Sequence, residues 1–151
     1  MNSMDDTGLV AAPASGQTRR THRLRGLAVT GVIATLAAMV ATTLAAALVL
    51  AAGVDFEVPD GGEAIPLPGF AVVTGFFSVV GIVIAGAFLR WSARPVERFV
   101  WTAVSLTAIS LVPPLISGAD TATTAALLGL HLVPAAVMIP TLARSLRTRT
   151  D

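Results

Sequence analysis

The chain has 151 residues, a formal net charge of +1, 54% hydrophobic residues and only 13% charged residues. Soluble domains carry about 25% charged residues, so this low density predicts a protein whose surrounding solvent is lipid. The chain has no Cys, Lys or Tyr, which excludes disulfides, thiolate metal sites, cysteine nucleophiles and Schiff-base lysines. It has two His residues, too few for a histidine-based metal site without carboxylate ligands.

The segment 1–25 is the first domain that the sequence predicts. Its first part mixes Asp, Gly, Pro and Ser with small apolar residues and lacks periodicity, so we expect a disordered cytoplasmic tail. The tail ends in a basic juxtamembrane run, which contains four of the ten arginines. A nucleic-acid patch is an alternative for this run, but its position beside an apolar segment favours topology and contact with anionic lipid.

Four apolar segments follow and define the second domain, residues 26–146, before a cytoplasmic tail at 147–151. A helix needs about 20 apolar residues to cross the hydrocarbon layer. The predicted spans are 27–52, 68–89, 98–118 and 121–143. The fold class is therefore all-α, a bundle of four transmembrane helices. The first span is too long for the apolar region of a signal peptide, so we expect it to be retained.

The positions of the arginines predict the orientation of the bundle. Short loops rich in Arg stay in the cytoplasm. All ten arginines fall before the first span, between the second and third, or after the fourth. They are Arg19, Arg20, Arg23, Arg25, Arg90, Arg94, Arg98, Arg144, Arg147 and Arg149. Both termini are therefore predicted inside the cell (N-in/C-in), in a multi-pass protein of the cytoplasmic membrane.

Small residues and prolines indicate how the spans pack. Thr30, Ala34, Ala38, Thr42 and Ala46 recur at every fourth position of the first span. Such a ridge lets a neighbouring helix approach closely, either within one chain, which we favour, or across a homo-oligomer seam. Pro113 and Pro114 cannot donate hydrogen bonds, so the third span should kink or end early near them. Pro95 and Glu97 should begin that span, and Asp120 should cap the fourth.

His131 is the ionisable side chain deepest in a span, and Pro134 follows it. Ionisable groups inside a membrane are functional candidates by default. The plainer interpretation, which we favour, is a neutral histidine that is hydrogen-bonded to Thr107 or Ser110 across a helix interface. The same three residues are the candidates for a catalytic site.

Four carboxylates follow the first span: Asp55, Glu57, Asp60 and Glu63. They are weak candidates for a divalent metal site, because their spacing does not match an EF-hand, and we favour a solvated loop. The nucleotide-binding and hydrolase motifs GxGxxG, GxxxxGK[ST], HExxH and GxSxG do not occur. No cofactor is predicted, and whether the protein is an enzyme stays open.

Several short motifs resemble a family of small actinobacterial membrane proteins that is catalogued as a domain of unknown function. They are Gly53–Val58, Val100-Trp101-Thr102, Ser110-Leu111, His131-Leu132 and a terminal Ile-Pro-x-Leu. The resemblance covers residues 25–146 and implies four membrane-spanning helices and an actinobacterial host, but no known activity. Trp101 and His131 occupy positions that match the family pattern.

Three functions are compatible with these observations. The first is a non-catalytic accessory or interaction subunit, whose partners are the bilayer and either a second copy or another membrane protein, and not nucleic acid. The second is an enzyme that acts on a lipophilic small molecule through His131 and nearby hydroxyls. The third is a small oligomeric transporter, although the paucity of charge within the spans disfavours coupling to ions.

Overall fold

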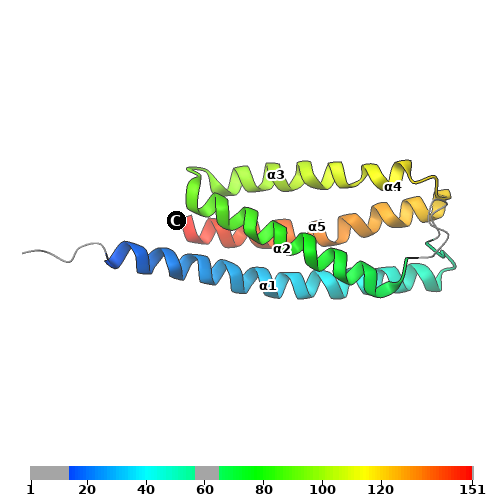
Figure 1. The fold of residues 1–151 in the computed structure, drawn as a ribbon, viewed down its shortest axis with the longest axis horizontal. Helices are drawn as coiled ribbons and strands as arrows, with labels where there is room; N and C mark the ends of the chain where they lie inside the picture. Colours follow the sequence, from blue (N-terminus) through cyan, green and yellow to red (C-terminus); the bar gives the residue numbers. More distant parts are fainter. Residues whose placement is uncertain (1–13, 57–64, 151) are drawn as a thin grey trace, which may run out of the picture.

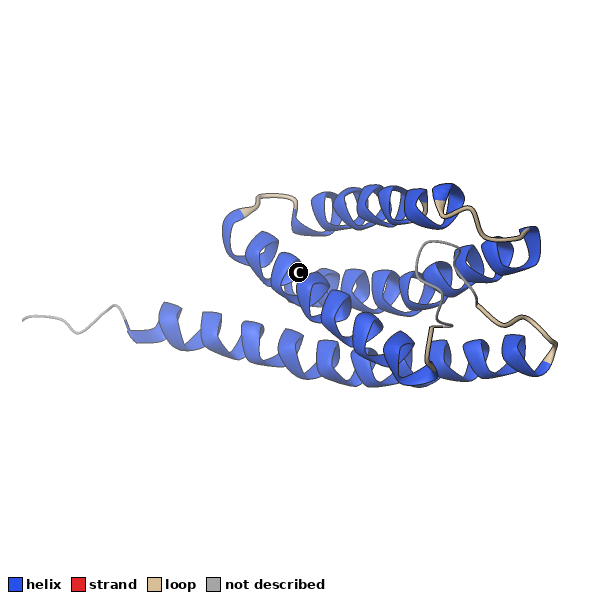
Figure 2. Ribbon diagram, turned by 45° about the vertical axis from the view of Figure 1, so that its right-hand side comes forward, coloured by secondary structure: helices blue, strands red, loops and turns tan. Residues whose placement is uncertain are grey.

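A computed structural model describes residues 14–56 and 65–150, with side chains from residue 16 onward. This part of the chain consists of helices and their connections, with no strand (Figure 2). The helices in chain order are α1 (Ala14–Ala51), α2 (Leu67–Trp91), α3 (Pro95–Ser110), α4 (Val112–Ile116) and α5 (Thr121–Thr150). Four stretches are long and apolar enough to cross a membrane, with α3 and α4 together forming the third. The predicted all-α fold with four spans is confirmed.

The four spans run up and down and place α2 and α5 at the centre of the bundle (Figure 1). α1 packs against α2 and α5, and α3 packs against the same two helices from the other side. Within the described ranges, the backbones of α1 and α3 are not direct neighbours. The start of α1, the α2–α3 connection and the end of α5 lie at one end of the bundle, which we call the arginine end. We call the other the acidic end, because Asp55 and Asp120 lie there.

The ridge of small residues on α1 is the main contact surface within the bundle. Ala34, Ala38, Thr42 and Ala46 are at most 4% exposed, as expected for packing inside one chain. Glycines extend the close approach. A Cβ atom built on Gly31 would lie 2.7 Å from Ile82 Cδ1 of α2, and one on Gly75 would lie 3.1 Å from Met39 Sδ of α1. Since apolar side chains gain little by leaving lipid for each other, this close packing stabilises the bundle.

The core divides into two clusters along the bundle axis. The inner cluster, toward the arginine end, contains Leu27, Ala34, Ala38, Ala85, Phe99, Met138, Leu142 and Leu146. The outer cluster, toward the acidic end, contains Ala46, Phe56, Leu127 and Leu130. On α1 the division falls at Thr42, and on α5 it falls in the stretch that holds Pro134.

The third span breaks where Pro113 and Pro114 predict it. α3 ends at Ser110 and α4 begins at Val112, because the two prolines cannot donate to the carbonyls of Ile109 and Ser110. The Leu111 N–H instead donates to Ala108 O at 3.3 Å. The Ser110 hydroxyl donates to Thr107 O at 2.7 Å, so it satisfies a carbonyl two to three residues before those of Ile109 and Ser110.

The remaining helix ends also follow their local sequence. α2 begins at Leu67 with Pro66 as N-cap, one residue before the predicted start at Pro68. Pro95 opens α3, and Glu97 places a carboxylate in its first turn, where it interacts favourably with the helix dipole. Asp120 caps α5 as predicted: its Oδ1 accepts from the N–H groups of Ala122 at 2.8 Å and Thr123 at 3.1 Å.

Two helices are longer than the sequence predicts. We expected an irregular tail up to Arg25, but α1 begins at Ala14, and we expected a tail after 146, but α5 continues to Thr150. The reason is that Ala, Gln and Arg favour helix. The two segments contain no Pro, and the single glycine, Gly16, does not end the helix. The basic residues at both ends of the chain are therefore held on helices. The predicted tail at 1–13 lies outside the described residues.

Candidate functional site

The arginine end concentrates the basic charge of the molecule. All ten arginines lie in the first turns of α1, around the α2–α3 connection, or in the last turns of α5 (Figure 1). The described residues include three carboxylates, and Glu97 alone belongs to this end. It lies 3.6 Å from Arg94. Among the described residues, this end therefore carries a large excess of positive charge.

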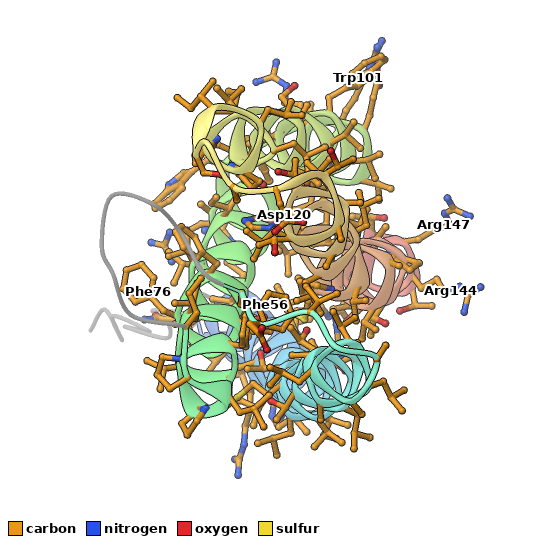
Figure 3. The ribbon with its side chains drawn as sticks, turned by 90° about the vertical axis from the view of Figure 1, so that its right-hand side faces the viewer. Phe56, Phe76, Trp101, Asp120, Arg144 and Arg147 are labelled. Carbon is orange, nitrogen blue, oxygen red and sulfur yellow. The ribbon has the colours of Figure 1, made fainter. Side chains whose placement is uncertain are left out.

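The arginines differ in how firmly they are held. Arg90 lies over the ring of Trp91, with its Cζ atom 5.5 Å from the ring centroid. Arg144 and Arg147 project away from the bundle (Figure 3). Arg149 is half-buried, and its Nε donates to the Ser145 hydroxyl at 3.1 Å. Among these side chains, Arg149 is the best positioned to bind an anion, because the buried Ser145 holds it in place.

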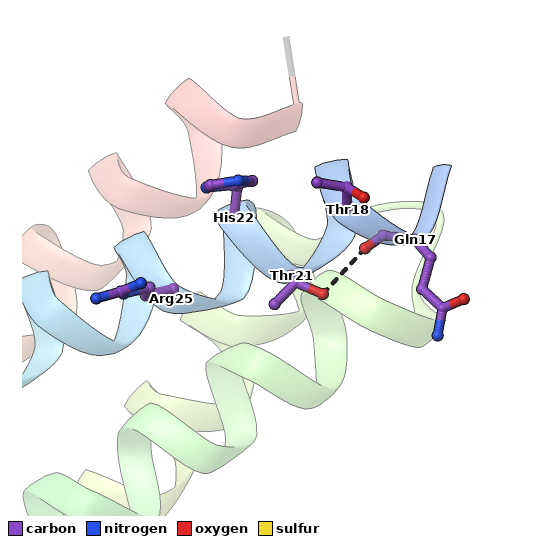
Figure 4. A pocket seen from close by; sticks show the side chains of 5 residues that line it. All are labelled: Gln17, Thr18, Thr21, His22 and Arg25. Carbon is purple, nitrogen blue, oxygen red and sulfur yellow. Dashed lines mark hydrogen bonds between the residues drawn. The ribbon is translucent and has the colours of Figure 1, made fainter. Parts of the chain in front are cut away.

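Two open clefts lie beside the first turns of α1. The larger, about 470 Å³, is lined by one helix alone, through Gln17, Thr18, Thr21, His22 and Arg25 (Figure 4). The smaller, about 260 Å³, lies between two helices: α1 contributes Arg19, His22 and Arg23, and α5 contributes Thr148 and Arg149. His22 lines both clefts. Sequence reasoning missed this convergence, because it treated both basic segments as tails.

The three residues predicted to meet in the membrane, His131, Thr107 and Ser110, each bond within their own span. His131 Nδ1 lies 2.7 Å from Leu127 O, and Thr107 Oγ1 donates to Ala103 O at 2.8 Å. The predicted hydrogen bond between His131 and either hydroxyl is therefore wrong. The physical reason is that each side chain reaches a carbonyl three or four residues earlier, so no neighbouring helix is needed. Neither of the two clefts includes these residues.

Of the four carboxylates predicted as a weak metal site, only Asp55 lies in the described part of the chain. Glu57, Asp60 and Glu63 fall outside it. Within residues 14–56 and 65–150, no three His, Cys, Asp or Glu side chains gather closely enough to hold a metal ion. The metal hypothesis therefore receives no support from the residues that can be placed.

Phe56 is a core residue that the sequence analysis did not identify. It follows Asp55 in the connection after α1, is fully buried, and lies between the helices at the acidic end (Figure 3). Its ring centroid is 5.0 Å from that of Phe70 in α2. Its φ of 54° places it in the left-handed region, which is unusual for a bulky residue and requires compensation from the surroundings. Burial of the ring against Phe70 supplies that compensation.

Thr42 carries an unsatisfied polar group in the middle of the core. Its side chain is 2% exposed, and its Oγ1 has no hydrogen-bond partner among the described residues. By contrast, Thr35, about two turns earlier on α1, donates to Gly31 O at 2.9 Å. A buried hydroxyl without a partner is destabilising, so Thr42 is an exception in this bundle.

Asp120 is the described carboxylate whose ionisation the fold alters. The Thr123 side chain donates a hydrogen bond to it, and the N–H groups of Thr123 and Ala122 add two more. These donors stabilise the ionised form and hold the pKa of Asp120 below its ordinary value of 3.8, although partial desolvation opposes the shift. Asp120 therefore acts as a structural cap at neutral pH.

Comparison with known families decides where the sequence belongs. It matches the family of unknown function DUF6069 over residues 22–148, which is most of the chain. The chain is a member of that family. The resemblance to a family of unknown function is thus confirmed. Comparison with curated proteins and with solved structures finds no match.

The DUF6069 match covers the four apolar segments and part of each side of the smaller cleft. It begins at His22 and ends at Thr148, so Arg23 lies inside the matched range, while Arg19 and Arg149 lie just outside it. The match also includes Trp101 and His131. It supports a membrane protein with four apolar helices and brings no activity with it.

Proposed function

We propose that this DUF6069 member is a multi-pass protein of the cytoplasmic membrane, with its arginine end and both termini inside. The support is geometric as well as compositional, since three segments far apart in sequence bring all ten arginines to one end of the bundle. Short segments rich in Arg are retained on the cytoplasmic side. An actinobacterial host is part of the same proposal and rests on the sequence resemblance.

Single-cysteine labelling tests this orientation cleanly, because the chain has no cysteine of its own. Ala52→Cys places an exposed thiol at the acidic end, and Ser92→Cys and Thr150→Cys place thiols at the arginine end. A membrane-impermeant maleimide should label Ala52→Cys in intact cells and the other two only after permeabilisation. Labelling of Thr150→Cys in intact cells would reverse the proposed orientation.

In biochemical terms, the protein is a non-catalytic accessory subunit that docks another membrane protein against its third span. The observation that carries this proposal is the backbone break at Leu111. Irregular backbone is tolerated inside a membrane only where protein or water covers it, because lipid offers no hydrogen bonds. Yet, although Pro114 is buried, three apolar side chains near the break are exposed: Ile109 by 64%, Leu115 by 61% and Ile116 by 76%.

The depth of the break supports the same proposal. Leu111 lies 16 residues after the start of α3, or about 24 Å along a helix, which is inside a hydrocarbon layer about 30 Å thick. The third span is also the least buried of the four, with 11% of its most apolar window buried against 28% for the first. A partner helix at this face would cover the break, where Pro113 and Pro114 cannot donate to the carbonyls of Ile109 and Ser110.

Site-specific photo-crosslinking tests the docking face. A photoreactive amino acid at Ile109 or Leu115 should give one discrete crosslinked protein in native membranes. The matched controls are Val72 and Val73 of α2, which are 68% and 55% exposed and also lie in the outer half of a span. They should crosslink to lipid. Equal protein crosslinking from both helices, or lipid crosslinking from both, would contradict the proposal.

A catalytic role for His131 is the second candidate, and one observation favours it. A carbonyl oxygen only accepts hydrogen bonds, so the contact with Leu127 O assigns the proton of the neutral ring to Nδ1. Nε2 then keeps its lone pair as a base inside the membrane. His131→Gln should abolish product formation at unchanged protein abundance if this role exists. If the metabolite profile of that variant is unchanged, His131 has no catalytic role, and the accessory role is the function that remains.

A further inference from the structure

From the cleft between α1 and α5, we infer a binding site for a phosphate group. The cleft is about 260 Å³ and is lined by Arg19, His22, Arg23, Thr148 and Arg149. Guanidinium groups bind phosphate oxygens through pairs of parallel hydrogen bonds, which makes Arg the preferred residue for this ligand. The inference does not depend on the accessory role proposed above, because the site lies at the opposite end of the bundle from the break in the third span.

Arg149 is held in place by two contacts. Its Nε donates to Ser145 Oγ, and Ser145 is only 7% exposed, so this anchor is part of the packed bundle. Its guanidinium group also lies directly against Gly26 of α1, where an added Cβ would be 2.7 Å from Nη2 and 2.8 Å from Cζ. Glycine at position 26 therefore makes room for the guanidinium of Arg149, which lines the cleft in this position.

Among the described residues, the charged side chains that line this cleft are all arginines. Arg19, Arg23 and Arg149 bring three positive charges to one small volume. The carboxylates of the described residues do not offset them, since Glu97 pairs with Arg94 and the others lie at the acidic end. These three positive charges repel one another. A bound phosphate is negatively charged and would attract all three.

A structural role as a helix-dipole partner does not account for all three arginines. The C-terminus of a helix carries the equivalent of about half a negative charge, which one arginine near the end of α5 more than balances. Arg147 and Arg149 both lie in the last turn of α5. Retention of the arginine end inside the cell requires basic residues but not their convergence on one cleft. The convergence is what a bound anion explains.

The size of the cleft limits the ligand. Sites for drug-sized molecules range from about 300 to 1,000 Å³, so a volume of about 260 Å³ suits a phosphate or diphosphate group and little more. The group would come either from a soluble phosphate compound or from the headgroup of an anionic lipid. The cleft lies close to where α1 enters its apolar segment, at Gly26 and Leu27, so both sources reach it.

Two probes separate these sources. Inorganic pyrophosphate is titrated calorimetrically into the full-length protein in a zwitterionic detergent, and phosphatidic acid is added to the same sample and counted by native mass spectrometry. Phosphatidylcholine is the lipid control. Binding of pyrophosphate and phosphatidic acid supports a site that recognises the phosphate alone. Binding of phosphatidic acid but not of pyrophosphate supports a lipid headgroup as the ligand. Binding of pyrophosphate but not of phosphatidic acid supports a soluble phosphate compound.

Matched arginines on the same helices distinguish a built site from general basicity. Arg19→Gln, Arg23→Gln and Arg149→Gln should each weaken binding about tenfold, the loss of one hydrogen-bonded charge. Arg20→Gln and Arg147→Gln remove the same charge from residues that do not line the cleft, so they should weaken binding by no more than about twofold. Arg149→Lys should recover only part of the affinity, because an ammonium group lacks the planar fork.

Gly26→Ala is the sharpest variant, since it changes no charge. The added methyl should displace the Arg149 guanidinium from its position and weaken binding severalfold, while helix propensity keeps α1 at least as stable as before. Thermal unfolding of this variant should match wild type. The inference is overturned if neither probe binds, if cleft and control arginines weaken binding equally, or if Gly26→Ala binds as wild type does.

Discussion

The two core clusters of this bundle are built by different means. The inner cluster draws all its buried residues from the helices themselves, at periodic positions that face neighbouring helices. The outer cluster is smaller and depends on Phe56, which belongs to the connection after α1 and has a left-handed backbone. A membrane bundle can thus be packed by periodicity at one end and closed by a single loop residue at the other.

Removal of Phe56 should give the largest effect. Phe56→Ala empties a fully buried site next to Phe70 and should lower the free energy of unfolding by about 3 kcal/mol, the lower end of the range for buried phenylalanine. The control is Phe76→Ala, because Phe76 is 63% exposed and projects from the bundle (Figure 3). Unfolding in SDS monitored by circular dichroism measures both. Equal losses would remove the distinction between the two clusters.

Overpacking the ridge tests the inner cluster. Ala38 is fully buried against the neighbouring helices, whereas the adjacent Ala37 is exposed. Ala38→Leu should destabilise the bundle by about 2 kcal/mol, since a packed interface has no room for three further carbon atoms. Ala37→Leu adds the same atoms toward lipid and should be close to neutral. The same SDS titration compares the two, and a neutral Ala38→Leu would show that the ridge is loosely packed.

A substitution at Thr42, which lies at the boundary between the two clusters, should raise the stability of the protein instead of lowering it. Thr42→Val removes a buried hydroxyl that has no partner and keeps the shape of the side chain, so it should stabilise the protein by about 1 kcal/mol. Thr35→Val is the matched control, because it deletes a hydroxyl that donates to Gly31 O and should be neutral or slightly destabilising. Destabilisation by Thr42→Val would mean that this hydroxyl binds water or a ligand.

The smallest effect is expected at the acidic end, from the cap of α5. Because folding lowers the pKa of Asp120, its carboxylate stabilises the fold at pH values above the ordinary 3.8, and this contribution disappears as the pH falls through the lower folded value. Asp120→Asn keeps the capping oxygen and loses the charge. Its melting temperature should fall slightly below that of wild type at pH 6, and the gap should close toward pH 2. A constant gap would contradict this assignment.

The sequence predicts the helical framework well, because spans, caps and breaks are local. Long apolar runs, Asp120 before α5 and the Pro113-Pro114 pair all act within a few residues of where they stand. The contacts of Phe56, Thr42 and Arg149 are not predictable in the same way, because each depends on what a distant helix presents. The error at His131 is the opposite case, because the ring bonds Leu127 O on its own helix, whereas the prediction assigned it a partner on a neighbouring helix.

The unbroken length of α1 has a mechanical consequence. Its 38 residues extend about 57 Å, nearly twice the thickness of the hydrocarbon layer, and the first dozen residues precede the apolar segment. These residues form a rigid lever about 18 Å long. A change of 10° in the tilt of the span would swing its tip by about 3 Å. A change in bilayer thickness, or a neighbouring protein that altered the tilt of α1, would therefore change the distance between the first turns of α1 and the end of α5.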